Sequence, residues 1–192
     1  MTILTKNKTT EQIRMKNKTL YLTQAALIAA LYAALTYVSG AAGLAFSGIQ
    51  FRLSEALTVL ALFTPAAVPG LAVGCAVSNV FSTVNPADIL IGGAATYLSA
   101  VLARRFRDVK IKGYPFVSVL MPVLFNAIFV GAELTVFYSE KNTAVKFFLT
   151  SCITVGAGEA AVCFTLGSAV IYFITKNEQL RSLLGQAELR RK

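Results

Sequence analysis

The stretch Leu20–Val38, LYLTQAALIAALYAALTYV, contains 19 residues without a charged side chain. A helix needs about 20 mostly apolar residues to cross a membrane. The apolar core of a secretory signal is shorter, at about 7–15 residues. We therefore interpret this stretch as a retained first membrane span, and it indicates a chain that folds as a bundle of transmembrane helices.

The composition of the whole chain agrees with a membrane location. Of its 192 residues, 56% are hydrophobic and 14% are charged, whereas a typical soluble domain contains about 25% charged residues. The chain has no histidine, which removes the usual general base and the most common metal ligand. Its three cysteines, Cys75, Cys152 and Cys163, lie within apolar segments and are expected to act as small apolar filler. We therefore expect no metal site, no cofactor and no catalytic residue.

Five further apolar segments follow the first one, so the sequence predicts an all-α integral membrane protein with six transmembrane helices. The expected spans are Leu20–Val38, Ser54–Phe63, Pro65–Phe81, Asp88–Ala103, Tyr114–Phe137 and Thr143–Thr175. They make up one transmembrane domain over residues 19–175. The basic tail over residues 1–18 is expected to be disordered, and a second basic tail follows over residues 176–192.

The basic residues set the orientation of the predicted bundle. Six spans place both tails and the loop between the fourth and fifth spans on one side of the membrane, and 15 of the 18 Lys and Arg residues lie there. The other side holds Arg52, Lys141 and Lys146. Because cytoplasmic loops are enriched in Lys and Arg, both termini are predicted to be cytoplasmic. This asymmetry accounts for the net charge of +9 without a nucleic-acid partner.

Several polar side chains interrupt the apolar segments in what is then the outer half of the protein. An ionisable residue within a span costs about 2.5–3.5 kcal/mol on insertion scales, and it normally faces a partner or a cavity. The carboxylates outnumber the one deeply placed arginine, which favours a ligand that donates hydrogen bonds or carries positive charge. The polar candidates for substrate binding are Arg52, Glu55, Asn79, Asp88, Asn126, Glu133 and Glu159.

Each of these residues also has a structural interpretation that needs no ligand. Asp88 follows Asn85-Pro86, and this pattern favours a helix N-cap over a ligand contact. Arg52 and Glu55, three residues apart, can form a local ion pair. Asn79 can form a hydrogen bond with a neighbouring helix. Glu133 and Glu159 can form a buried ion pair with Arg52.

The first span carries a second pattern, in which Ala26, Ala30 and Ala34 recur at every fourth residue. Small residues at this spacing let another helix approach closely. The stripe starts at the predicted cytoplasmic end of the span. It is therefore a candidate docking face for a separate membrane protein, and the alternatives are packing within its own bundle or dimerisation of the chain.

The order of these features resembles a known family. Residues 48–79, GIQFRLSEALTVLALFTPAAVPGLAVGCAVSN, and residues 88–105, DILIGGAATYLSAVLARR, look like the queuosine-precursor transporter (QueT) family. Members of this family are S components of energy-coupling factor (ECF) transporters. The resemblance covers residues 19–174, and its most specific parts are FRLSEAL and TPAAVPGL.

This resemblance implies a six-helix substrate-binding subunit in the bacterial cell membrane. Such a subunit binds substrate on the outer side and topples within the membrane to release it inside. Energy would come from two cytoplasmic ATPases through a transmembrane coupling protein, which the face formed by Ala26, Ala30 and Ala34 would contact. The chain contains no GxxxxGK[ST] phosphate-binding loop, so ATP would be hydrolysed by the separate subunits.

The substrates implied by the resemblance are 7-deazaguanines, such as the aminomethyl or cyano precursor or queuine. A guanine-like edge presents adjacent N–H donors that one carboxylate can accept. We expect Glu133 or Glu159 to accept from this edge. Arg52 would bind the carbonyl oxygen, and Glu55 would orient Arg52. The aromatic candidates for stacking on the flat ring are Phe51 and Phe129.

The chain also fits other classes of membrane protein. One is an S component for a different vitamin-like molecule. Another is a stand-alone secondary transporter, although the two repeat halves typical of such transporters are not evident. A membrane enzyme would need a base beside a nucleophile such as Ser54 or Ser78, and the sequence offers none.

Overall fold

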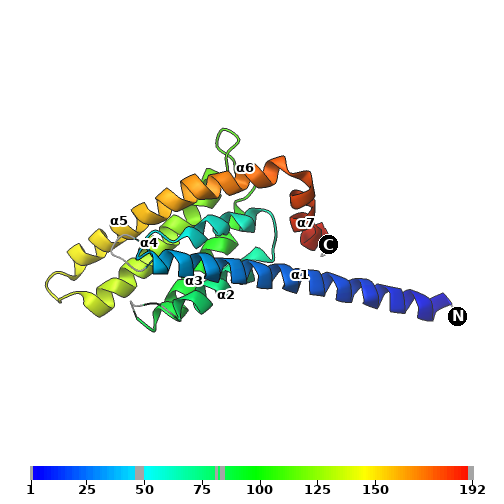
Figure 1. The fold of residues 1–192 in the computed structure, drawn as a ribbon, viewed down its shortest axis with the longest axis horizontal. Coiled ribbons are helices and arrows are strands. Elements are labelled where there is room, and N and C mark those ends of the chain that lie inside the picture. The colour runs from blue at the N-terminus through cyan, green and yellow to red at the C-terminus, as the bar shows by residue number, and fades with distance from the viewer. Residues whose placement is uncertain (1, 46–49, 81, 83–84, 190–192) are drawn as a thin grey trace.

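The chain is helical throughout its computed structural model, which describes residues 2–45, 50–80, 82 and 85–189 (Figure 1). Side chains are described for residues 18–45, 50–80, 82 and 85–185. The elements are α1 (Thr2–Ala41), η1 (Leu53–Leu62), α2 (Ala67–Asn79), α3 (Asp88–Arg105), α4 (Phe116–Tyr138), α5 (Ala144–Val162), η2 (Cys163–Gly167), α6 (Ser168–Lys176) and α7 (Glu178–Leu189). Within these residues the one β-type pairing is an isolated bridge between Ile111 and Tyr114. The predicted all-α class is therefore confirmed.

Helical structure lies within each of the six predicted spans. Among the described residues, three helical stretches are long and apolar enough to cross a membrane: Lys18–Ala41, Phe116–Tyr138 and Ala144–Lys176. The last of these runs without a break through α5, η2 and α6. Helices η1 and α2 are apolar but shorter. These helices support a membrane protein, while six crossings and two cytoplasmic termini stay predictions.

Both tails contain helix as well. Residues 2–18, for which we expected disorder, form the N-terminal part of α1, because no Gly or Pro interrupts the helix before Leu20. This part of α1 extends beyond the rest of the bundle in Figure 1. After α6 the chain turns and forms α7, which lies back toward α1. The expected end of the third span at Phe81 and the last three basic residues, 190–192, lie outside the described residues.

Helices α1 and α2 pack with their backbones unusually close together. A Cβ atom on Gly70 would lie 2.7 Å from the carbonyl oxygen of Ala25, and one on Gly74 would lie 2.8 Å from that of Ala29. The two glycines are four residues apart, as in the small-residue packing motifs of membrane helices. The alanines of α1 at positions 25 and 29 therefore serve the internal contact with α2.

The short helix η1 occupies the centre of the bundle. It contacts each of the helices α1 to α6 and the π-helical segment η2. Seven of its ten residues are buried: Ser54, Glu55, Ala56, Thr58, Val59, Leu60 and Ala61. It is a 3₁₀-helix along its whole length, although such helices seldom exceed three or four residues. This central position brings Glu55 close to residues from most of the other helices.

Candidate functional site

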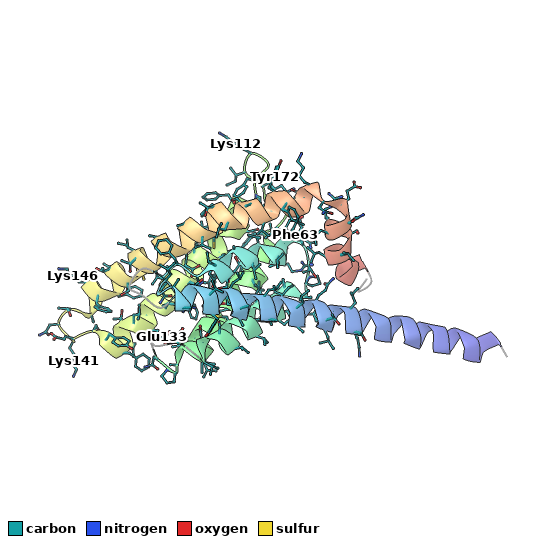
Figure 2. The ribbon with its side chains drawn as sticks, in the orientation of Figure 1. Phe63, Lys112, Glu133, Lys141, Lys146 and Tyr172 are labelled. Carbon is teal, nitrogen blue, oxygen red and sulfur yellow. The ribbon has the colours of Figure 1, made fainter. Side chains whose placement is uncertain are left out.

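The polar residues predicted to bind substrate are all buried in the bundle. They lie on η1, just before it, and on the helices α2 to α5. Figure 2 places Glu133 toward the end of the bundle that carries Lys141, in the α4–α5 loop, and Lys146, in the first turn of α5. The buried set, each 1–4% exposed, is Arg52, Glu55, Asn79, Asp88, Asn126, Glu133 and Glu159.

Arg52 forms its ion pair with a residue that is distant in sequence. Its Nη2 atom lies 3.5 Å from Asp88 Oδ2, and its Nε donates to the carbonyl oxygen of Ala45 at 3.2 Å. The prediction that Asp88 caps α3 is wrong, since this helix has no side-chain cap. The Asn85 side chain instead accepts from the backbone N–H of Ala87 at 2.8 Å. A buried guanidinium needs a nearby carboxylate, and that need turns Asp88 inward.

Glu55 has a different partner from the one expected. Its Oε1 atom accepts a hydrogen bond from the hydroxyl of Tyr32, a fully buried residue of α1. Glu55 and Arg52 are also close enough for electrostatic interaction. Asp88 holds the Arg52 guanidinium, and a role of Glu55 in orienting Arg52 stays a prediction.

Asn79 joins α2 to α3. Its Nδ2 atom donates to the backbone oxygen of Asp88 at 2.9 Å and lies 3.6 Å from Cys75 Sγ. The facing position on α3 is Gly92, where a Cβ atom would lie 2.5 Å from Asn79 Nδ2 and 3.0 Å from Asp88 Oδ1. The alternative interpretation of Asn79 as a helix-to-helix contact is therefore confirmed for its amide nitrogen.

The buried polar residues form two neighbouring groups, and Arg52 is close enough to the carboxylates of both for electrostatic interaction. Arg52, Asn79, Asp88 and Glu133 make up the Arg52 group, in which Glu133 is close enough to Asp88 and Arg52 for electrostatic interaction. Glu55, Asn126 and Glu159 make up the Asn126 group, in which the Asn126 side chain interacts with both carboxylates. Gly158 lets α5 approach the backbone at Gln50, shortly before η1, because any Cβ there would lie 2.2 Å from the Gln50 backbone oxygen.

Both groups contain buried oxygen atoms that have no hydrogen-bond partner among the described residues. A buried acceptor left unpaired costs about 1–3 kcal/mol, and such atoms are rare in folded proteins. Gathered in one region, they can accept hydrogen bonds from a ligand that donates several. These atoms are Glu55 Oε2, Asn79 Oδ1, Asp88 Oδ1, Glu133 Oε1 and Oε2, and Glu159 Oε2.

The two aromatic candidates lie in less buried positions. Phe51 is 37% exposed. Phe129 is half-buried and stacks on Phe125 of the same helix, with ring centroids 5.9 Å apart and planes 24° apart. One face of the Phe129 ring is thus covered from within α4, and stacking of either phenylalanine on a ligand stays a prediction.

The alanine stripe of α1 is exposed on the surface of the bundle. Ala26, Ala30 and Ala34 are exposed, whereas the neighbouring row at positions 25 and 29 packs against α2. Leu27 and Leu31 beside the stripe are 60% and 46% exposed. Packing of the stripe within its own bundle, one of the alternatives above, is therefore wrong.

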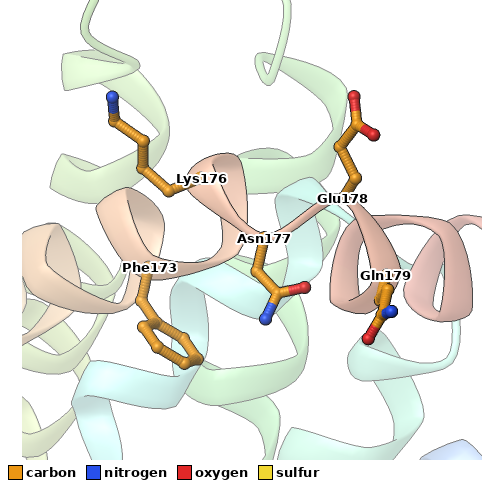
Figure 3. Close-up of a pocket in the computed structure, with 5 residues that line it drawn as sticks. All are labelled: Phe173, Lys176, Asn177, Glu178 and Gln179. Atoms are coloured by element: carbon orange, nitrogen blue, oxygen red, sulfur yellow. The ribbon is translucent and has the colours of Figure 1, made fainter.

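A surface pocket lies elsewhere, where α6 meets α7. Figure 3 shows the five residues that line it, namely Phe173, Lys176, Asn177, Glu178 and Gln179. Lys176 is 17 residues beyond Glu159 on one continuous helical stretch, or about 25 Å along its axis. This pocket contains none of the predicted site residues.

Sequence reasoning missed several polar residues that support the site. Tyr32 and Thr36 lie one turn apart on α1, and the Thr36 hydroxyl donates to Ser54 Oγ at 2.7 Å. Gln50 is 2% exposed and lies beside α5. The i, i+4 spacing of Tyr32 and Thr36 could have indicated their role, because it puts two hydroxyl groups on one face of the first predicted span.

Comparison with known proteins agrees with the resemblance noted above. The chain is 34% identical over 97 residues to the queuosine precursor transporter QueT of Lactococcus lactis subsp. cremoris (strain MG1363). That alignment covers 48% of this chain and 57% of the relative, so it spans little more than half of the curated protein. No solved structure matches the chain. The sequence profile of the QueT transporter family matches residues 22–176, which is most of the chain, and the chain belongs to this family.

Proposed function

We propose that this chain is the substrate-binding S component of an ECF-type importer, and that it takes up a queuosine precursor of the 7-deazaguanine class. The observation that carries the proposal is the set of buried, unpaired carboxylate and amide oxygens inside an apolar helical bundle. Family membership supports transport, and the name of the Lactococcus relative supports a queuosine precursor as the substrate.

The chemistry of the site suits a 7-deazaguanine. The guanine-like edge carries adjacent N–H donors, and the Asn126 group offers acceptors at Glu55 Oε2 and Glu159 Oε2. Asn126 interacts with both carboxylates and can donate to or accept from the same edge. In the Arg52 group, Asp88 holds the Arg52 guanidinium, and in this proposal Arg52 donates to the carbonyl oxygen of the ligand. Charge-assisted hydrogen bonds of this kind are stronger than neutral ones.

In this proposal separate partner proteins supply the energy for transport. In this proposal six helices cross the membrane with both termini in the cytoplasm, as the distribution of Lys and Arg favours. The exposed stripe of Ala26, Ala30 and Ala34 docks on a transmembrane coupling protein, because small side chains allow a second helix to approach closely. Two cytoplasmic ATPases bound to that protein supply the energy.

Calorimetry on the purified full chain in detergent tests the substrate class. We expect 7-deazaguanines to bind and guanine and thiamin to bind much more weakly. Glu159→Gln should weaken 7-deazaguanine binding about 10- to 100-fold, because it replaces a charged acceptor by a neutral amide. Glu140→Gln is the matched control, since Glu140 is exposed. Binding of no 7-deazaguanine at all, or tighter binding of thiamin, would refute the proposed substrate class.

A further inference from the structure

The two groups of buried polar residues lie at different depths along α4. Asn126 and Glu133 are seven residues apart and are both buried, so they lie on the same face of the helix, about 10 Å apart along its axis. Asn126 belongs with Glu55 and Glu159, whereas Glu133 is close to Asp88 and Arg52. A ligand that contacts both Asn126 and Glu133 must therefore span this distance, and the unpaired oxygen atoms of the two groups suit hydrogen-bond donors at both of its ends.

The Arg52 group contains two carboxylates, Asp88 and Glu133, and one cation, Arg52. Among the residues that the structure describes, Arg52 is the one cation within electrostatic range of Glu133, and it already forms an ion pair with Asp88. Glu133 is 2% exposed, and among the described residues neither of its oxygens has a hydrogen-bond partner. The two lysines at this end of the bundle, Lys141 and Lys146, are exposed on the α4–α5 loop and the first turn of α5. The buried carboxylates thus exceed the buried cations.

We propose that the transported molecule carries a protonated amine, and that Glu133 binds this amine while the Asn126 group binds the donor edge of the heterocycle. This inference rests on the proposed function and narrows its substrate class. A buried carboxylate is stabilised by a counter-charge that also donates hydrogen bonds. An alkylamine supplies both, because like the Lys side chain it is protonated at pH 7.

The proposal separates the 7-deazaguanines by the group at their far end. The aminomethyl compound would place its ammonium group at Glu133. The cyano compound would place a nitrogen lone pair there, which repels a carboxylate and leaves its oxygens unpaired. We therefore expect the aminomethyl compound to be preferred over the cyano compound. A hydroxymethyl or methyl analogue, which is similar in size but uncharged, should bind with intermediate or low affinity.

A cycle of two ligands and two proteins tests the role of Glu133. The full chain and its Glu133→Gln variant are titrated with aminomethyl-7-deazaguanine and with the 7-methyl analogue at pH 7. In the unchanged chain the aminomethyl compound should bind about 10- to 100-fold more tightly than the methyl analogue. Glu133→Gln should remove most of this difference while changing the affinity for the methyl analogue by less than about threefold. Retained binding of the methyl analogue shows that the variant is folded, and Glu140→Gln should behave like the unchanged chain.

The outcomes distinguish this inference from the proposed function. If the cyano or methyl compound binds as tightly as the aminomethyl compound, the amine assignment is wrong while 7-deazaguanine transport stands. If Glu133→Gln weakens both ligands equally, Glu133 has a structural role and the assignment is again wrong. If no 7-deazaguanine binds the unchanged chain, the proposed function fails and the amine assignment fails with it.

Discussion

Two adjacent glycines of α3 are predicted to respond in opposite ways to alanine. A Cβ atom at Gly92 would lie 2.5 Å from Asn79 Nδ2, whereas one at Gly93 would meet Ala76 Cβ at 3.5 Å. The second distance is an ordinary van der Waals contact, so Gly93→Ala needs no rearrangement. The first is too short by about 1 Å, so Gly92→Ala must displace the Asn79 amide.

The cost follows from the hydrogen bond that this amide makes. Asn79 Nδ2 donates to the backbone oxygen of Asp88 at 2.9 Å, and both residues are 1% exposed. Breaking this bond leaves a buried donor and a buried acceptor unpaired, at about 1–3 kcal/mol. Both substitutions gain the same helix propensity, about 1 kcal/mol, which cancels when they are compared. Gly92→Ala should therefore be about 1–3 kcal/mol less stable than Gly93→Ala.

Thermal unfolding followed by far-ultraviolet circular dichroism measures this difference. For a chain of this size, the melting temperature of Gly92→Ala should be about 2–12 °C below that of Gly93→Ala. Because Asp88 also holds Arg52, Gly92→Ala should in addition weaken 7-deazaguanine binding at least about tenfold. Equal melting temperatures and equal affinities for the two variants would refute the contact between Gly92 and Asn79 and its link to the site.

Two further substitutions test the hydrogen bond on Glu55 and the exposed stripe of α1. Tyr32→Phe removes the hydroxyl that donates to Glu55 and should lower the free energy of unfolding by about 1–3 kcal/mol; an unchanged melting temperature would contradict that contact. Ala30→Leu fills the exposed stripe and should abolish uptake by cells that carry the whole transporter, while substrate binding by the purified chain is retained. Ala161→Leu, at an exposed alanine of α5, should leave both activities intact, and equal loss of uptake in the two variants would exclude a specific docking role.

The helical class and the positions of the helices within the six apolar segments could be predicted because they depend on local properties of the chain, whereas the helical structure of residues 2–18 and α7 was not predicted. Apolar runs such as Leu20–Val38 and Tyr114–Phe137 are long enough to specify helices by themselves in a membrane. The burial of Glu133 and Glu159 was predictable for the same reason, since a charge within an apolar run faces protein. The spacing of Ala26, Ala30 and Ala34 also identified one small-residue face of α1, although it could not tell whether that face packs inside the bundle.

The partners of the buried charges were not predictable, because they depend on how distant helices meet. Arg52 and Asp88 are 36 residues apart in sequence, so the nearer Glu55 was the natural choice. In the structure Glu55 instead accepts a hydrogen bond from the Tyr32 hydroxyl. Nothing in the alanine-rich sequence around Tyr32 indicates that Glu55 is its partner. Periodicity identifies the face of a helix, whereas the partner on that face is chosen by the packing of the whole bundle.

The 3₁₀ winding of η1 has a consequence for length. A 3₁₀-helix rises about 2.0 Å per residue and an α-helix about 1.5 Å. The ten residues of η1 therefore reach about as far as the 13 residues of α2, at about 20 Å each. The tighter winding lets a short segment match its longer neighbour. It also makes the segment intolerant of changes in length, because deleting one residue between Glu55 and Leu62 would rotate the Glu55 side chain by about 120° away from Tyr32.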